Sequence, residues 1–305
     1  MFFRKWLSLL LLTAMIAVLC GPAVGAAEAL DITAESVILV DADSGKVLYQ
    51  KNPDKRLPPA SMTKLMTLVL GVEALRADRV EYDETVVASE NAWRLGGSQI
   101  YLEPGEKMSY RDMMVAIAVG SANDACVAVA EHLEGSHEAF VEKMNKKAAE
   151  LGMKNTHYVN SYGLHDPNHY STARDMAILG RYALNFPELL ELTSIKEYDL
   201  RGGEFKLYNT NKLLWWYEGA DGFKTGWHNE AKYCLVSTVK RNNLRLVAVV
   251  MGCPEPRGNF SDSMAIYNYG FARYAYKGFV DPGAVCGLTR VGKGTSEAVE
   301  VVAEK

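Results

Sequence analysis

Two residues at the start of a long apolar segment have the types and spacing for nucleophilic chemistry. Ser61 and Lys64 follow Pro58-Pro59, and the apolar segment continues to Leu75. Proline suits the approach to a helix and not its interior, so we expect a buried helix that begins here, with Ser61 and Lys64 on one face. A buried lysine is costly when charged, and a neutral lysine is a base for a neighbouring serine. The pair therefore predicts an activated serine nucleophile.

The same spacing also fits a structural role, because a helix-capping serine beside a lysine that extends to solvent produces it by chance. Two further polar groups favour the catalytic interpretation. Ser121 and Asn123 lie between two helical patterns, and Lys224-Thr225-Gly226 enters a predicted strand. Ser-x-x-Lys, Ser-x-Asn and Lys-Thr-Gly together form the signature of penicillin-binding proteins and class A β-lactamases. The middle group here is Ser-Ala-Asn and not Ser-Asp-Asn.

More narrowly, the chain resembles the low-molecular-mass penicillin-binding proteins that act as D-alanyl-D-alanine carboxypeptidases, the S11 serine peptidases. The resemblance covers about residues 30–277 and is closest to the carboxypeptidases of spore-forming Gram-positive bacteria. Besides the three motifs it rests on five runs, which are Ser36–Gly45, Gly96–Ile100, Leu151–His157, Ala231–Tyr233 and Leu246–Gly252.

This resemblance implies a peptidoglycan stem peptide ending in D-Ala-D-Ala as the substrate and an acyl-enzyme on Ser61. Lys64, neutral because of burial and the nearby charge of Lys224, would take the Ser61 proton. Ser121 would relay that proton to the leaving D-alanine, and Asn123 would hold Lys64 and the substrate amide. Water would then hydrolyse the acyl-enzyme, and β-lactam antibiotics would acylate the same serine and inhibit the enzyme.

The third motif is expected to bind the carboxylate end of the substrate. Lys224, which should keep its charge, and the Thr225 hydroxyl would supply a cation and a hydrogen-bond donor. Gly226 would let the strand approach the substrate backbone closely. We expect the oxyanion between the N–H groups of Ser61 and Trp227.

Strand patterns lie toward both ends of the chain, and helical patterns lie between them. Hairpins are predicted over residues 36–50 and 233–251, residues 110–185 are mostly helical, and a further helix spans 262–276. The predicted fold class is α+β and sandwich-like, with a five-stranded antiparallel sheet from both chain ends and helices on it. An inserted all-helical lobe completes a β-lactamase/transpeptidase-like fold, with the cleft between lobe and sheet.

The termini predict export and a short appended segment. Residues 1–26 read as a signal peptide, with Arg4 and Lys5 before the apolar core Trp6–Leu19 and a small-residue cleavage site at Val24-Gly25-Ala26. Residues 27–278 are the predicted catalytic domain. Residues 279–305 read as a β-like stub of a truncated C-terminal domain, without the amphipathic anchor that relatives often carry, so membrane contact stays open.

Composition excludes some other functions. Without Arg4 and Lys5, 31 of the 33 basic residues face 37 acidic residues, which gives the mature chain a net charge of about −6 and no basic surface for nucleic acid. The four mature cysteines form no Cys-x-x-Cys pair and read as core residues, and Pro167 separates His165 from His169. We therefore expect no metal site. We also expect no cofactor, and we expect the protein to be a monomer.

Two alternatives belong to other classes of function. A class A β-lactamase would also need a glutamate that activates the deacylating water, usually in a Glu-x-x-Leu-Asn loop, and no such pentapeptide occurs between Ser121 and Lys224. A non-catalytic wall-binding protein would tolerate the loss of Ser61, Lys64 or Lys224, and all three are present. The sequence therefore favours an extracytoplasmic carboxypeptidase.

Overall fold

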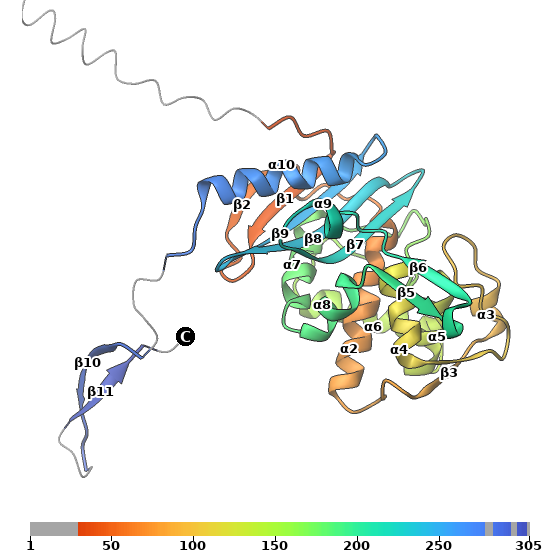
Figure 1. The fold of residues 1–305 in the computed structure, drawn as a ribbon, viewed down its shortest axis with the longest axis horizontal. Coiled ribbons are helices and arrows are strands. Elements are labelled where there is room, and N and C mark those ends of the chain that lie inside the picture. The colour runs from red at the N-terminus through yellow and green to blue at the C-terminus, as the bar shows by residue number, and fades with distance from the viewer. Residues whose placement is uncertain (1–29, 278–282, 294–297, 304–305) are drawn as a thin grey trace, which may run out of the picture. The chain divides into compact units, whose positions relative to one another are not determined.

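A five-stranded antiparallel sheet joins two segments that lie far apart in the sequence (Figure 1). The computed structural model describes residues 30–277, 283–293 and 298–303, so the predicted export signal lies outside the described residues. The strand order is β2-β1-β9-β8-β7, which confirms the predicted sheet from both chain ends. The strands are β1 (Ser36–Asp41), β2 (Val47–Lys51), β7 (Ala220–His228), β8 (Lys232–Arg241) and β9 (Leu244–Cys253).

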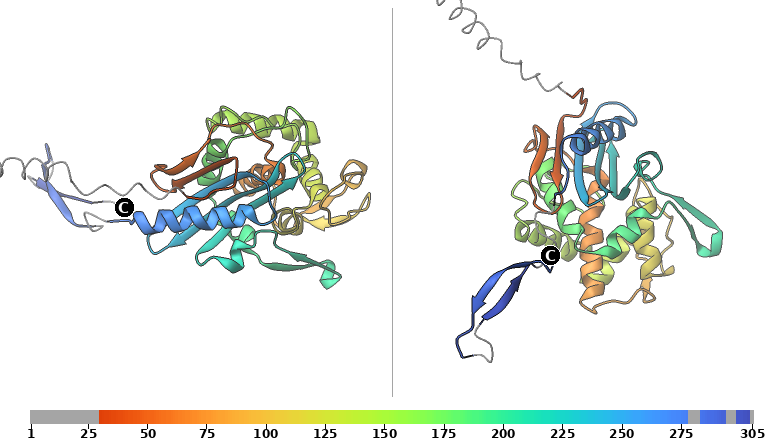
Figure 2. Two further views of the ribbon diagram at one scale, coloured as in Figure 1. Left: turned by 90° about the horizontal axis from the view of Figure 1, so that it is seen from above. Right: turned by 60° about the vertical axis from the view of Figure 1, so that its left-hand side comes forward.

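Helices cover both faces of this sheet, because successive residues of a strand point to opposite sides and both sets are apolar here. On one face, Gly270 of α10 lies against Leu39 and Leu246. On the other, Gly180 of α7 lies against Val247, the next residue along β9. The two views in Figure 2 show the sheet between these layers. The covering helices are α7 (Ala173–Ala183) and α10 (Gly258–Arg273).

The predicted lobe is inserted between β2 and β7, but it is not all-helical as expected, because it also contains two short antiparallel strand pairs. Its helices and turns are η1 (Ala60–Thr63), α2 (Lys64–Arg76), α3 (Glu90–Trp93), α4 (Tyr110–Val115), η2 (Ala116–Gly120), α5 (Asn123–Glu134), α6 (His137–Glu150), α8 (Pro187–Ser194), η3 (Arg201–Gly203) and α9 (Leu213–Trp216). Two short antiparallel pairs accompany them, β3 (Thr85–Val87) with β4 (Lys107–Ser109) and β5 (Glu197–Leu200) with β6 (Phe205–Tyr208).

Helix α2 is the buried centre of the molecule, as its apolar composition predicts. Its residues from Lys64 to Val72 are all buried, and each fully buried Leu, Met or Val side chain contributes about 1.5–3 kcal/mol. The start of the helix differs from the prediction in one respect. Ser61 lies in η1, a 3₁₀ turn in front of α2, and not in the first turn of an α-helix. The tighter turn still leaves Ser61 and Lys64 side by side, since residues i and i+3 eclipse in a 3₁₀-helix.

The helix predicted over residues 110–119 is present but changes its winding. It begins as α4 and continues as the π-helical η2, which ends at Ser121 in a left-handed conformation with φ 60°. π-Helical turns occur frequently at functional sites. The turn reverses the chain so that α5 begins at Asn123, and the second motif lies at the junction of two helices.

The C-terminal strands pair with each other in the part of the chain that the structure describes. They are β10 (Val285–Arg290) and β11 (Ala298–Val302), and their residues are exposed, among them Cys286. The expectation that all four cysteines are core residues is therefore wrong for Cys286 and holds for the other three. Among the described residues, no helix is long and apolar enough to cross a membrane.

Candidate active site

The turn that carries Ser61 is fixed by close backbone contacts on two sides. On one side lies β7, where a Cβ on Gly226 would stand 2.7 Å from the carbonyl oxygen of Pro59. On the other side lies the loop before α7, where Gly163 has φ +88° and a Cβ would collide with the carbonyl group of Ala60. Glycine is the residue that permits both approaches. Ser61 is therefore held between the sheet and the lobe.

Lys64 points its amine at Ser61. Its Nζ lies 2.9 Å from Ser61 Oγ, 2.7 Å from Asn123 Oδ1 and 2.6 Å from the carbonyl oxygen of Tyr162. The side chain is fully buried, and burial lowers the pKa of Lys64 to about 8, with Asp124 opposing the shift. Cys126 is also buried beside it, but burial raises the pKa of that thiol to about 12, so it is neutral. Lys64 is thus a base with an accessible neutral form.

Lys224 is the second buried amine, with 1% of its surface exposed. Burial and the charge of Lys64 lower the pKa of Lys224 to about 7. Its hydrogen bond to the carbonyl oxygen of Thr225 is weak, with 3.4 Å between Nζ and the oxygen. The sequence predicted that Lys224 keeps its proton and Lys64 loses it. In this structure the better hydrogen bonding favours the proton on Lys64, because hydrogen bonds to the charged form stabilise it.

The Ser-Ala-Asn motif is anchored to the loop that precedes it in the lobe. Asn123 donates from Nδ2 to the carbonyl oxygen of Gly96 at 2.7 Å. Its backbone N–H donates to the carbonyl oxygen of Ser98 at 2.8 Å. These two bonds orient the side-chain amide, so its oxygen is directed at the amine of Lys64.

Asp124, the next residue, strengthens the same attachment. Its buried carboxylate accepts the backbone N–H groups of Ile100 and Leu102 at 3.1–3.2 Å. Carboxylates that accept backbone N–H groups form charge-assisted hydrogen bonds, which are stronger than neutral ones. The 96–102 loop and the start of α5 therefore form one unit.

The cavity in front of Ser61 has a volume of about 410 Å³ and brings the three motifs together. Five of the eight predicted site residues line it, namely Ser61, Ser121, Thr225, Gly226 and Trp227. The other three, Lys64, Asn123 and Lys224, are buried and do not line it. The Thr225 hydroxyl donates to Thr210 Oγ1 at 2.7 Å, and the exposed Trp227 ring lies 6.0 Å from that of Tyr233.

Comparison with known proteins decides which family this geometry belongs to. Residues 23–255 match the family described as D-alanyl-D-alanine carboxypeptidase. The chain belongs to this family. It is 43% identical over 271 residues to the D-alanyl-D-alanine carboxypeptidase DacF of Bacillus subtilis, an alignment that covers 88% of this chain and 70% of the relative.

Solved structures of penicillin-binding proteins share the fold of this D-alanyl-D-alanine carboxypeptidase. Penicillin-binding protein 5 of Haemophilus influenzae is 38% identical with a TM-score of 0.79, over 88% of this chain and 79% of the other. Penicillin-binding protein D2 of Listeria monocytogenes, solved in its ampicillin-bound form, is 32% identical with a TM-score of 0.73, over 79% and 99%.

The carboxypeptidase cavity also has walls that the motif search did not assign. Ser98 belongs to Gly96–Ile100, one of the segments on which the family resemblance rests. Trp216 and Arg257 belong to no motif, so the sequence alone does not assign them to the site. Trp216 and Phe260 pack edge to face at 5.4 Å, and the exposed Arg257 lies over Trp216 at 5.8 Å. The remaining unassigned lining residues include Thr210 and Lys212. No short motif marks them, because they meet only when α9 packs on β7 and the start of α10 packs on β8.

Proposed function

We propose that this protein removes the terminal D-alanine from peptidoglycan stem peptides through an acyl-enzyme on Ser61. The observation that carries the assignment is the contact of 2.9 Å between Lys64 Nζ and Ser61 Oγ at the cavity wall. A buried amine with a pKa of about 8 at this distance is a general base that is partly neutral near physiological pH. Membership of the D-alanyl-D-alanine carboxypeptidase family supports the substrate class.

Acylation begins when Ser61 Oγ attacks the carbonyl carbon of the penultimate D-alanine and Lys64 takes its proton. The negative oxygen that develops is stabilised by the N–H groups of Ser61 and Trp227, which belong to the turn and the strand held together at Gly226. Ser121 passes the proton to the leaving D-alanine, and Asn123 keeps Lys64 in position through its 2.7 Å contact. Water then hydrolyses the ester and regenerates Ser61.

The substrate carboxylate settles which lysine holds the proton. The two amines titrate as a pair, and in the free protein the pair is already partly deprotonated near neutral pH because burial lowers both pKa values. An anion bound at Thr225 raises the pKa of Lys224 and draws the remaining proton to it. Lys64 is then neutral when Ser61 needs a base. The exposed cation of Arg257, on the same cavity wall, gives the carboxylate a direct partner.

The same site accepts β-lactams, whose strained amide takes the place of the D-Ala-D-Ala bond. The similarity to a Listeria penicillin-binding protein solved with ampicillin supports this proposal. We further propose that the protein acts outside the cytoplasm in cell-wall biogenesis, because peptidoglycan lies there, and that it is a monomer exported by residues 1–26. N-terminal sequencing of the secreted protein tests export, and a mature chain that still begins at Met1 would contradict it.

Mass spectrometry of the purified protein with a D-Ala-D-Ala pentapeptide tests the reaction. The expected products are the tetrapeptide and free D-alanine, and an amine acceptor in the mixture shows any transfer as a longer peptide. An intact pentapeptide after incubation with folded protein would overturn the proposal.

Labelled penicillin tests the nucleophile. We expect one penicilloyl adduct on Ser61 and none on Ser61→Ala, since alanine has no hydroxyl to acylate. Slow release of the adduct separates this carboxypeptidase from a β-lactamase, which would turn the penicillin over rapidly. An adduct on another residue, or on the alanine variant, would show that Ser61 is not the nucleophile.

A further inference from the structure

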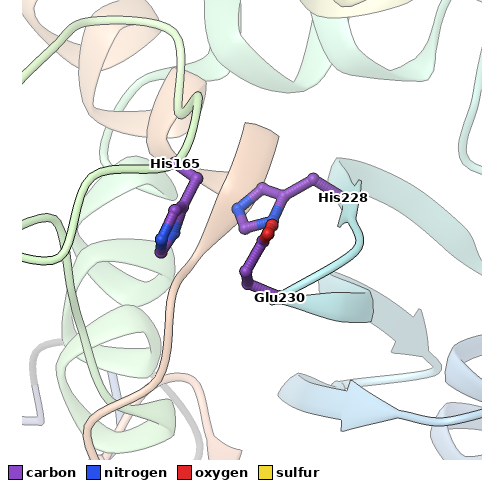
Figure 3. A group of neighbouring side chains, drawn as sticks. All are labelled: His165, His228 and Glu230. Atoms are coloured by element: carbon purple, nitrogen blue, oxygen red, sulfur yellow. The ribbon is translucent and has the colours of Figure 1, made fainter.

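Two histidines and a glutamate gather beside the cavity without a part in the proposed reaction. His228 ends β7, Glu230 lies in the turn that follows, and His165 comes from the loop before α7. Figure 3 shows the two imidazole rings near each other, with the Glu230 carboxylate against the ring of His228. One ligand atom from each residue lies within 4.8 Å of the other two. The cluster thus offers three metal-ligating groups at one point.

The His228 ring provides the second observation. Its Nε2 is buried and has no hydrogen-bond partner among the described residues, whereas its Nδ1 lies 2.9 Å from Glu230 Oε2 and 3.1 Å from the backbone nitrogen of Ala231. A buried polar atom without a partner is unfavourable, and such atoms call for an explanation such as a bound ion. The ring centroid of His165 lies 5.6 Å from that of His228, so a second imidazole is available beside this unpartnered atom.

We propose that His165, His228 and Glu230 bind a divalent transition-metal ion, with Zn²⁺ the best match. Two imidazoles and one carboxylate are typical zinc ligands, and three protein ligands leave a fourth position for water. Bonds of this kind place ligand atoms about 3.3 Å apart in a tetrahedral site. His165 and Glu230 are exposed, so rotation of their side chains closes the gap from 4.8 Å.

The cluster lies on two segments that both contact the Ser61 turn, so a bound ion would link these segments. The loop that carries His165 also carries Gly163, which packs on Ala60, and the strand that ends at His228 also carries Gly226, which packs on Pro59. These are the two segments that hold the Ser61 turn. A metal ion would tie them together on the outer side of that turn. The cysteine spacing and Pro167 between His165 and His169 led us to expect no metal. The sequence did not pair His165 with His228, because the two lie far apart in the chain and share no spacing motif.

Titration with Zn²⁺ followed by calorimetry tests the site. The protein is used without an affinity tag and in a Cys286→Ser background, since the exposed thiol of Cys286 is an independent zinc ligand. We expect one ion per chain, with affinity at least about tenfold weaker in His165→Ala and in Glu230→Gln, since the loss of a second-shell partner alone typically costs about 10–100-fold. His132→Ala removes an imidazole of α5 that pairs with Glu84, away from the cluster and its loop, and should bind like the parent.

Amide hydrogen exchange tests whether the ion links the His165 loop to the end of β7. Zn²⁺ should slow amide exchange in residues 160–168 and 228–231 of the parent and leave His165→Ala unchanged. The His165→Ala and Glu230→Gln variants alter exposed side chains, so their melting temperatures should match the parent without metal. Absence of binding to the parent, or equal binding to His165→Ala, would overturn the proposal. The readouts use neither peptide nor penicillin, so they are independent of the proposed carboxypeptidase function.

Discussion

Lys64 and Lys224 are both buried, but they have different hydrogen-bond partners. Three acceptors surround the amine of Lys64, whereas the amine of Lys224 makes a long contact of 3.4 Å. Burial lowers the pKa of both lysines. When the two amines share one proton, it resides on the amine with the better hydrogen-bond acceptors. A bound carboxylate changes that balance in favour of Lys224. The chemistry of Ser61 therefore depends on two residues that do not line the cavity.

Arginine substitutions separate the roles of the two lysines. Lys64→Arg should reduce acylation of Ser61 by penicillin about 100-fold to 10,000-fold, the range for loss of a general base, because arginine stays protonated near neutral pH. Lys224→Arg should keep measurable acylation and mainly weaken binding of peptides with a free carboxylate. Acylation rates are compared for a free-acid peptide and its C-terminal amide. Acylation of Lys64→Arg at the parent rate would show that Lys64 is not the base.

The pH dependence follows from the same pair. A neutral Lys64 and a charged Lys224 require one proton on the pair, so kcat/KM for a free-acid peptide should peak between about pH 7 and pH 8. Below this window Lys64 is protonated, and above it Lys224 loses its charge. The C-terminal amide needs no cation, so its rate should stay high on the alkaline side. An equal alkaline decline for both peptides would count against a carboxylate role for Lys224.

At the scale of elements, the active site depends on how η1 is held between the 160–166 loop and β7. The turn that carries Ser61 is four residues long and has no side-chain cap, so its own hydrogen bonds do little to fix it. The carbonyl oxygen of Tyr162 adds a contact to Lys64 from the same loop. Packing of the neighbouring elements therefore sets the position of the nucleophile.

Gly163→Ala tests this packing. The substitution places a Cβ against the carbonyl group of Ala60 at a φ of +88°, so the Ser61 turn must move. We expect acylation to fall at least about tenfold, which corresponds to ~1.4 kcal/mol in the barrier. The left-handed backbone adds about 1–2 kcal/mol of strain. Penicillin acylation rates and thermal unfolding are measured together.

Gly105→Ala is the matched control. Gly105 has φ +83°, and nothing lies within 4 Å of a Cβ placed there. It should show the same backbone strain, with a melting temperature lower by about 2–8 °C, and an acylation rate close to the parent. If the two variants lose acylation equally, strain and not displacement of the Ser61 turn explains the loss.

At the scale of the whole molecule, the sheet and the lobe supply the two sides of the cavity. The sheet draws β1 and β9 together from opposite parts of the sequence, with Val37 opposite Val250 and Leu39 opposite Ala248. Buried side chains of β1, β9, β7 and α2 then belong to one continuous hydrophobic core. Strands β10 and β11 pair with each other, and none of the cavity-lining residues comes from them.

A chain that ends at Lys277 should therefore keep its activity. All the residues that line the cavity lie between Ser61 and Phe260, so the deletion leaves the cavity walls intact. We expect the acylation rate to stay within about twofold of the full chain, because a domain with its own core folds independently. Circular dichroism confirms folding of the shortened chain. Loss of acylation in a folded, shortened chain would show that the tail contributes to the site.

Local patterns in the sequence determined most of the elements and all three motifs. Helix ends followed capping signals, such as Thr172, which accepts the N–H of Asp175 at the start of α7, and Gly135, which ends α5 at φ +79°. Strands followed apolar runs bounded by turns. These features depend on interactions between residues a few positions apart, which a sequence displays directly.

Only the tertiary structure decided the properties that depend on distant residues. The sequence showed two lysines, but two of their properties came from packing. These are the burial that lowers both pKa values and the acceptors that Asn123 and Tyr162 offer to Lys64. It showed His165 and His228, but their meeting with Glu230 required the loop and the strand to close around Ser61. Electrostatic and coordination effects act through space over a few ångströms, and the chain reaches those distances only when residues far apart in sequence pack together.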